Sequence, residues 1–215
     1  TREQRFIKDC LEQPIQRDLV NFCVQFGRVD MLRSLKILLD LTADDFRVED
    51  IQMVILLRHI NVLRFFNDDV GLTADDFRSE DDEGDTPIHI AAKNGDVSVL
   101  RFLDEEINLN VTDFRTEDDD GRTPIHHAAA NGHVAVLKFL KEVGLNTNDF
   151  RVEDYDGYTP IHIAAADGHV PVLKFLKKNA GLSVDDFITE DDEGYTPIHH
   201  AAANGHVGVL EFFKD

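Results

Sequence analysis

Apolar residues recur along the chain at spacings of three and four, the period of an amphipathic α-helix. Val97, Leu100 and Leu103 share one face of such a helix, and Phe102 begins a second apolar row. A shorter segment precedes it, beginning at Thr86-Pro87 and containing adjacent alanines, which allow close helix approach. Threonine suits a helix N-cap and proline the first helical position, while a following glycine can end the helix. The pattern predicts a helix, a tight turn, a second helix and a long loop.

This unit is repeated. Thr-Pro-Ile-His occurs four times, at intervals of 37, 36 and 37 residues, starting at Thr86, Thr123, Thr159 and Thr196. Each copy has a glycine two residues upstream, and Ala-Ala followed by another glycine downstream. Asp-Phe is a second marker in constant phase, at Phe46, Phe77, Phe114, Phe150 and Phe187. Repetition at a fixed period of this length is typical of solenoid folds.

We divide the chain into six units, which together form a single array over residues 1–215. Four are clear, over 81–117, 118–153, 154–190 and 191–215. Two degenerate units, 14–50 and 51–80, make up residues 14–80. Residues 1–13 are expected to form a capping helix ended by Pro14, since solenoids need atypical end units. The last unit keeps the apolar pattern of an internal repeat, so we expect it to be truncated or covered by something else.

The repeated string resembles the ankyrin repeat, whose units of about 33 residues carry Thr-Pro-Leu-His followed by alanine. Isoleucine replaces the leucine here, at Ile88, Ile125, Ile161 and Ile198, and conserves its volume. The resemblance is strong over 81–215 and weak over 14–80. It implies an all-α solenoid of stacked helix pairs with projecting loops. The loops exceed the family norm by three or four residues, as in longer-loop arrays from intracellular bacteria and large viruses.

The charge narrows the choice of partner. The chain has 42 acidic and 22 basic residues, a formal charge of -20, and 42% hydrophobic residues, enough for a continuous core. Such a surface repels phosphate backbones and anionic lipids, so nucleic acid and membrane surfaces are unsuitable partners. A protein with a basic or mixed-charge patch suits it better, and we expect the array to act as a monomer. Only two cysteines occur, with no apolar run of membrane-spanning length and no signal peptide, which favours a cytoplasmic, intracellular location.

Several repeated residues could suggest chemistry, but each has a structural interpretation. The motif histidines, one per unit, lack other metal ligands at suitable spacing, and the resemblance implies that they brace the turn. The acidic loop clusters lack the oxygen spacing of a calcium loop, and we expect Arg78, Arg115 and Arg151 partly to neutralise them. The Asp-Phe phenylalanines are expected to anchor the long loops in the core. We therefore predict no catalytic residue, no metal ligand and no cofactor.

Positions at which the residue differs between the four clear repeats are the candidates for contact with a partner. All three tyrosines fall beside the loop glycines, and tyrosine and arginine are enriched at binding hot spots. The resemblance places loop tips and first helices on the concave face that grips partners. The predicted partner-binding residues are Tyr155, Tyr158, Tyr195, Arg122, Asp85, Asp120, Asp156, His127 and His200.

The sequence thus predicts a protein-binding scaffold rather than an enzyme. Two alternatives remain. The chain could be the repeat segment of a larger multidomain protein, such as a bacterial effector delivered into a host cell, whose activity lies elsewhere. It could also be an engineered, near-consensus array, because residues 123–134 and 196–207 are identical, although the eroded first units argue against design.

Overall fold

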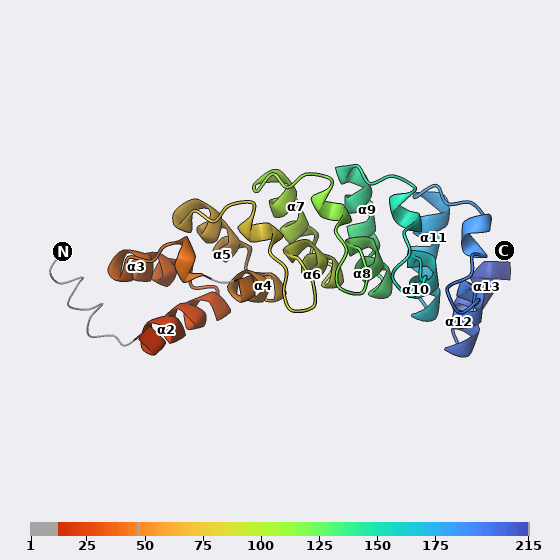
Figure 1. Cartoon of the computed structure of the whole chain (residues 1–215), viewed down its shortest axis with the longest axis horizontal. Helices are drawn as coiled ribbons and strands as arrows, with labels where there is room; N and C mark the ends of the chain where they lie inside the picture. The colour runs from red at the N-terminus through yellow and green to blue at the C-terminus, as the bar shows by residue number, and fades with distance from the viewer. Residues whose placement is uncertain (1–12, 47, 215) are drawn as a thin grey trace.

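The computed structural model describes residues 13–46 and 48–214, in which twelve α-helices form six pairs and no strand occurs. The all-α solenoid predicted from the sequence is confirmed (Figure 1). The capping helix expected over residues 1–13 lies outside the described residues, apart from Gln13, where α2 begins. The pairs are α2 (Gln13–Gln25) with α3 (Val29–Leu39), α4 (Val48–Leu56) with α5 (Ile60–Phe65), α6 (Pro87–Lys93) with α7 (Val97–Glu105), α8 (Pro124–Ala130) with α9 (Val134–Val143), α10 (Pro160–Ala166) with α11 (Val170–Lys178), and α12 (Pro197–Ala203) with α13 (Val207–Lys214).

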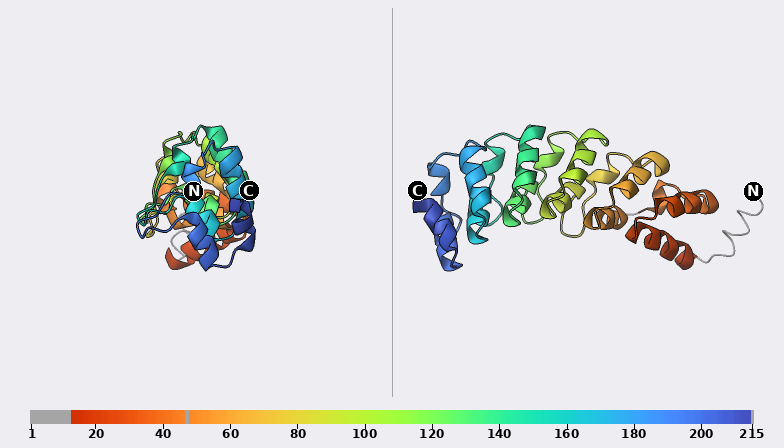
Figure 2. Two further views of the ribbon diagram at one scale, coloured as in Figure 1. Left: turned by 90° about the vertical axis from the view of Figure 1, so that its right-hand side faces the viewer. Right: turned by 180° about the vertical axis from the view of Figure 1, so that it is seen from behind.

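The stack is bowed. The first helices of the pairs lie along its inner edge and the second helices along its outer edge (Figure 1). Each first helix packs on the next, α6 on α8, α8 on α10 and α10 on α12. Viewed along the stack, the long loops project to one side of both helix layers (Figure 2). Inner helices and projecting loops therefore share one concave side.

The Thr-Pro-Ile-His motif begins each of the last four first helices, and its threonine and histidine side chains bond to each other in every copy. The hydroxyl of Thr123 lies 2.9 Å from Nδ1 of His126, which also accepts the Thr123 backbone N–H at 3.0 Å. The threonine and histidine side chains form a capping box in each copy, and Oγ1 of Thr159 accepts the backbone N–H of His162, so the prediction that the motif threonine caps its helix is confirmed. Nε2 of His126 donates to the carbonyl of Val152 in the next loop, at 3.0 Å. The predicted role of the motif histidine in bracing the turn is confirmed.

Burial controls the charge of this histidine. His126 is fully buried, and its desolvation lowers the pKa to about 4. Desolvation also lowers the pKa of His89 and of His162. These rings are therefore neutral near pH 7, which suits a side chain that accepts through one nitrogen and donates through the other.

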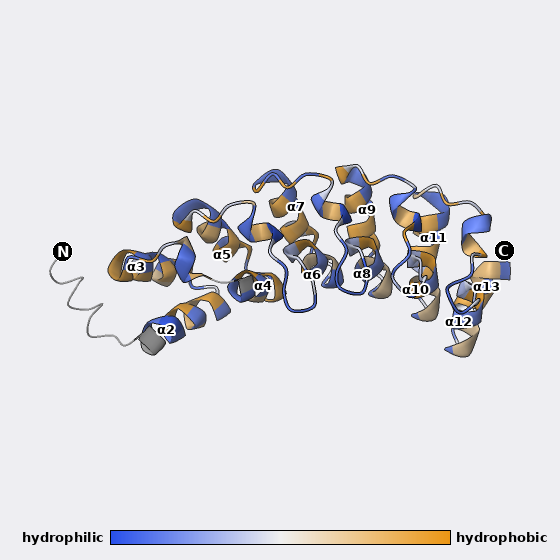
Figure 3. Ribbon diagram, in the orientation of Figure 1, coloured by the Kyte–Doolittle hydropathy of each residue, from blue (hydrophilic) through white to orange (hydrophobic). Residues whose placement is uncertain are grey.

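The loop phenylalanines complete the core. Phe114 is fully buried and packs edge-on against Phe139 of α9, with ring centroids 6.0 Å apart. Equivalent contacts join Phe77 to Phe102 and Phe150 to Phe175. Apolar residues line the facing sides of the helices along the stack (Figure 3). The prediction that these phenylalanines anchor the long loops in the core is confirmed.

The loop arginines have a different role from the one expected. Arg115 donates to Asp149 of the next Asp-Phe marker at 2.6 Å, rather than to the acidic clusters beside the glycines. Arg151 bonds Asp186 in the same way and lowers the pKa of that carboxyl to about 2. The expectation that these arginines neutralise the acidic loop tips is therefore wrong. They link each loop to the next instead of pairing with the acidic residues beside the glycines.

Candidate functional site

Each projecting loop ends in a turn built by one aspartate, which is buried in three of the four turns. Oδ1 of Asp118 accepts the backbone N–H groups of Asp120 and Arg122, at 3.0 and 2.8 Å. Gly121 occupies the turn with φ +77°, a conformation that favours glycine. The same arrangement recurs around Asp81, Asp154 and Asp191. These aspartates fix the turn, so the exposed residues on either side are held in defined positions.

Neighbouring turns are joined through their backbones. The N–H of Tyr155 donates to the carbonyl of Asp120 at 3.0 Å, and the N–H of Asp119 to that of Glu83 at 3.2 Å. We define the loop-tip ridge as the exposed residues at this edge, two from each turn: Asp82, Glu83, Asp119, Asp120, Tyr155, Asp156, Asp192 and Glu193. Seven of these eight residues are acidic, so the ridge concentrates negative charge along one edge.

In the first three of these four turns, the residue after the tip glycine contacts the next repeat. Arg122 donates through Nε to Oδ2 of Asp154 at 3.1 Å, across the boundary between two helix pairs. At the following boundary the ring of Tyr158 lies 5.0 Å from that of His200. At the preceding one Oδ1 of Asp85 lies 3.5 Å from Nε2 of His127.

These boundary contacts depend on one another. His127 Nε2 lies 2.7 Å from Oδ2 of Asp118, nine residues earlier, and His200 stands in the same relation to Asp191 at 2.6 Å. Burial alone would raise the pKa of Asp118, but the backbone N–H of Arg122 and the ring of His127 hold it below its ordinary value. Where Ile163 replaces the histidine, Arg122 reaches across to the aspartate instead. Each turn aspartate at these three boundaries thus receives a second donor, from its own helix or from the preceding loop.

A groove of about 480 Å³ opens beside the ridge, against the first helices α8, α10 and α12. Among the residues that line it are Arg122, His127, Asp156, Tyr158, Asp167 and His200. A second hollow, of about 400 Å³, is lined by Glu49, Gln52 and residues 80–83, so acidic groups dominate it. Both openings adjoin the tips of the projecting loops.

Two family models match the chain. One, described as ankyrin repeats in three copies, matches residues 22–151, and another, ankyrin repeats in many copies, matches residues 161–213. The chain belongs to the ankyrin repeat family. No curated protein matches it. Ankyrin repeats generally mediate protein–protein interaction, and the family is typically a non-enzymatic binding scaffold.

None of the helices in residues 13–46 and 48–214 of this ankyrin chain is long and apolar enough to cross a lipid bilayer.

The predicted contact residues comprise an exposed group, a half-buried group and two buried residues. Tyr155 and Tyr195 are exposed, at 67% and 49%, and Asp120 and Asp156 are exposed beside them. A second group, half-buried between repeats, consists of Arg122, Tyr158 and His200. The groove brings five of the nine predicted residues together, namely Arg122, His127, Asp156, Tyr158 and His200.

Two of the predicted residues are not surface residues. Asp85 is only 4% exposed and His127 only 8%. The sequence analysis predicted both as partner contacts, and their burial leaves little of either side chain for a partner to touch. The next repeat covers Asp85, and His127 turns toward its own turn aspartate. Both side chains are thus engaged in contacts within the array.

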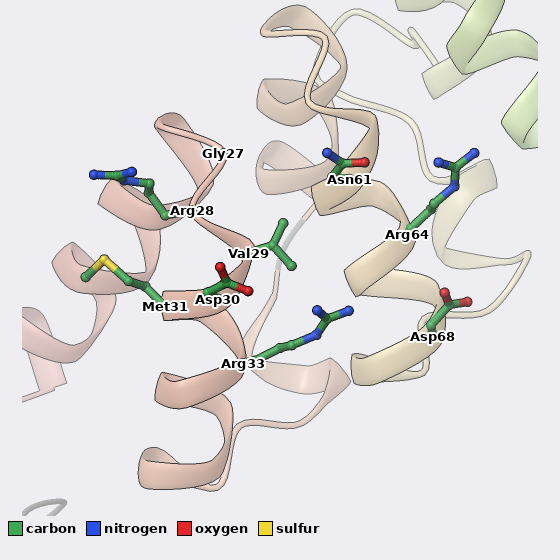
Figure 4. A pocket seen from close by; sticks show the side chains of 9 residues that line it. All are labelled: Gly27, Arg28, Val29, Asp30, Met31, Arg33, Asn61, Arg64 and Asp68. Carbon is green, nitrogen blue, oxygen red and sulfur yellow. The ribbon is translucent and has the colours of Figure 1, made fainter.

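A third hollow of this ankyrin array was not anticipated from the sequence. It measures about 740 Å³ and lies between α3 and α5, away from the loop tips (Figure 4). Arg33 and Arg64 line it, but they bond Asp69 and Glu106, at 3.0 and 2.8 Å. Because these two guanidinium groups already hold carboxylates, the hollow is a weaker candidate for a ligand than the groove.

Proposed function

We propose that this ankyrin array binds another protein through the loop-tip ridge and the adjoining groove, and that the partner contributes a basic or mixed-charge segment. The acidic ridge carries the proposal. The charge is unevenly distributed, since five exposed lysines lie on the outer helices α9 and α11, namely Lys138, Lys141, Lys174, Lys177 and Lys178. Opposite charges on the two sides would orient a basic partner toward the concave side.

The exposed tyrosines supply the second element of the proposed surface. Tyr155 projects from an otherwise acidic ridge, and Tyr195 follows the next tip glycine. Tyrosine offers a large apolar face with a polar end, at low conformational cost, and is enriched at hot spots. We assign these two residues the anchoring contacts and Asp120 and Asp156 the charge contacts.

The groove provides the third element. Arg122, Tyr158 and His200 line it while holding the repeats together, and Asp156 and Asp167 add acidic groups. An extended basic segment could lie on the ridge and place a side chain in the groove. The proposal leaves out Asp85 and His127, whose side chains are too buried to offer much contact area.

The array is proposed to act as a monomer inside the cell. Cys23 is buried and free of any disulfide, as suits a reducing compartment.

The experiment compares matched surface variants. Wild-type protein, the ridge variant Y155A/D156N/Y195A and the outer-helix variant K138A/K174A would each be used to capture proteins from a lysate. Binding of each retained protein would then be measured at two salt concentrations. We expect the ridge variant to lose binding by at least about tenfold, and high salt to weaken what the wild type retains. Equal binding by wild type and ridge variant, with loss in the outer-helix variant, would refute the proposed surface.

A further inference from the structure

A cluster of three metal-ligating side chains lies at the boundary between the α6–α7 and α8–α9 pairs. Asp85 comes from the loop before α6, Asp118 from the next loop, and His127 from α8. All three are buried, and one ligand atom from each lies within 4.8 Å of the others. The cluster therefore spans two repeats, with one carboxylate from the first and a carboxylate and an imidazole from the second.

The environment of Asp85 is unusual for a buried acid. Its side chain is 6% exposed, and its Oδ1, which faces His127, has no hydrogen-bond partner. Its nearest cation is Lys93, whose Nζ lies 3.7 Å from the other carboxylate oxygen and whose side chain is half exposed. Burying a carboxylate is costly unless hydrogen bonds or a cation compensate for its lost hydration. The cluster thus has an oxygen that lacks a partner and points toward a second carboxylate and an imidazole.

At the next two boundaries between helix pairs, a different residue occupies the position equivalent to Asp85. At the next boundary it is Arg122, a cation that bonds Asp154 directly. At the one after that it is Tyr158, a neutral ring over His200. Only the boundary at Asp85, of these three, places a second carboxylate beside the turn aspartate. At Asp85 no residue in the described part of the chain takes the place of the Arg122 guanidinium, and this difference suggests that a bound cation does.

The geometry suits a transition metal. His127 Nε2 lies 2.7 Å from Asp118 Oδ2 and 3.5 Å from Asp85 Oδ1. Ligands at about 2.0–2.2 Å around a tetrahedral Zn²⁺ lie about 3.3–3.5 Å apart, so a small separation of Asp118 from His127 would admit the ion. An imidazole ligand favours zinc and its neighbours over calcium or magnesium. His127 also lines the groove, which offers a route from solvent.

We propose that Asp85, Asp118 and His127 form a binding site for a divalent transition metal, Zn²⁺ in the first instance, with water as the fourth ligand. The ion would take the place that the Arg122 guanidinium has at the next boundary. Because its ligands come from two repeats, it would tie those repeats together and stabilise the array. The site touches the proposed protein-binding surface where His127 lines the groove, but none of its three ligands is among the contacts assigned to the partner.

The test measures zinc binding by calorimetry and by the shift in melting temperature, using untagged protein and ZnCl₂. The variants follow arrangements that this chain already accommodates. Asp85→Tyr copies the boundary at Tyr158, His127→Ile copies Ile163, and Asp85→Asn keeps the shape while removing the charge. The control is His200→Ile, because His200 pairs with Asp191 beside a tyrosine and lacks the second carboxylate.

We expect one zinc ion to bind the wild-type chain and raise its melting temperature. Each change at Asp85 or His127 should weaken binding at least about tenfold, while His200→Ile leaves the affinity unchanged. The proposal fails if the wild-type chain binds no zinc, or if D85N binds it as tightly as the wild type. Equal loss in H200I would also overturn it, because the ion would then lie elsewhere.

Discussion

The ring of Tyr158 lies over the imidazole of His200, with centroids 5.0 Å apart, and His200 in turn bonds the turn aspartate Asp191 at 2.6 Å. A tyrosine that would pass for a surface contact thus also covers a buried hydrogen bond between two repeats. Tyr158 is therefore both a predicted partner contact and a contact that stabilises the fold, and experiments can distinguish the two roles.

Tyr158→Ala should lower the free energy of unfolding by about 1–2 kcal/mol, since it removes a half-buried ring and opens the His200–Asp191 bond to water. Tyr158→Phe should keep most of that stability because the ring remains. Tyr155→Ala, at an exposed position, is the control and should cost less. Urea unfolding of the three variants measures the differences. A Tyr155 variant that loses more stability than the Tyr158 variant would contradict the structural role given to Tyr158.

Arg122 can be tested together with Ile163. Arg122→Ala leaves Oδ2 of Asp154 without its donor, and that side chain is only 1% exposed. Leaving a buried acceptor unsatisfied should cost about 1–3 kcal/mol. A histidine at position 163 stands nine residues after Asp154, the spacing at which His127 and His200 reach their aspartates. The double variant R122A/I163H should therefore recover part of the lost stability, as thermal unfolding would show. No recovery would mean that the two donors are not interchangeable.

Two glycines at equivalent tip positions separate backbone strain from packing. Gly157 and Gly194 have φ +79° and +80°, so alanine at either should cost about 1 kcal/mol in strain. A Cβ at Gly157 would lie 2.6 Å from the backbone nitrogen of Asp192, whereas at Gly194 nothing lies within 4 Å. We expect Gly157→Ala to be worse than Gly194→Ala by at least about 1 kcal/mol in denaturant unfolding. Equal costs would show that the tips can separate freely.

Lowering the pH should reduce the free energy of unfolding before the carboxylates become protonated. The pKa of His126 is about 4 in the folded chain and about 6.5 when unfolded, so between these values only the unfolded chain binds the proton. Stability is full above pH 6.5 and falls as the pH drops, by about 2 kcal/mol between pH 6.5 and 5 from this residue alone. Urea unfolding over this range should show a shallower pH slope for His126→Gln than for wild type. Identical slopes would contradict the buried, neutral state of His126.

The sequence was sufficient for features that each repeat carries within itself. The motif around Thr123 and His126 and the buried Phe114 are local, recur at every period and define the frame of the fold. The environment of Asp85 was not accessible in the same way. Whether that carboxylate meets water, an arginine or a histidine depends on a contact with a residue about 40 positions later, and periodicity does not reveal which side chains meet.

The same limit explains the error over Arg115. Its neighbours in sequence are the acidic tip residues, but the stacking of loops brings Asp149 of the next repeat closer. The exposed tyrosines were easier to anticipate, since Tyr155 and Tyr195 lie at the turn itself, where the loop projects beyond its neighbours.

The boundary contacts also constrain how such an array can change its length. Removing residues 154–190 would keep the helical period but place Arg122 against Asp191, whose second oxygen His200 already occupies. Duplicating the same segment would instead set Tyr158 against a second Asp154, beside an isoleucine rather than a histidine. Recombination therefore preserves these contacts only if it exchanges the loop of one repeat together with the turn and first helix of the next. In this array, a repeat keeps its stabilising contacts only when the first helix of the following repeat is passed on with it.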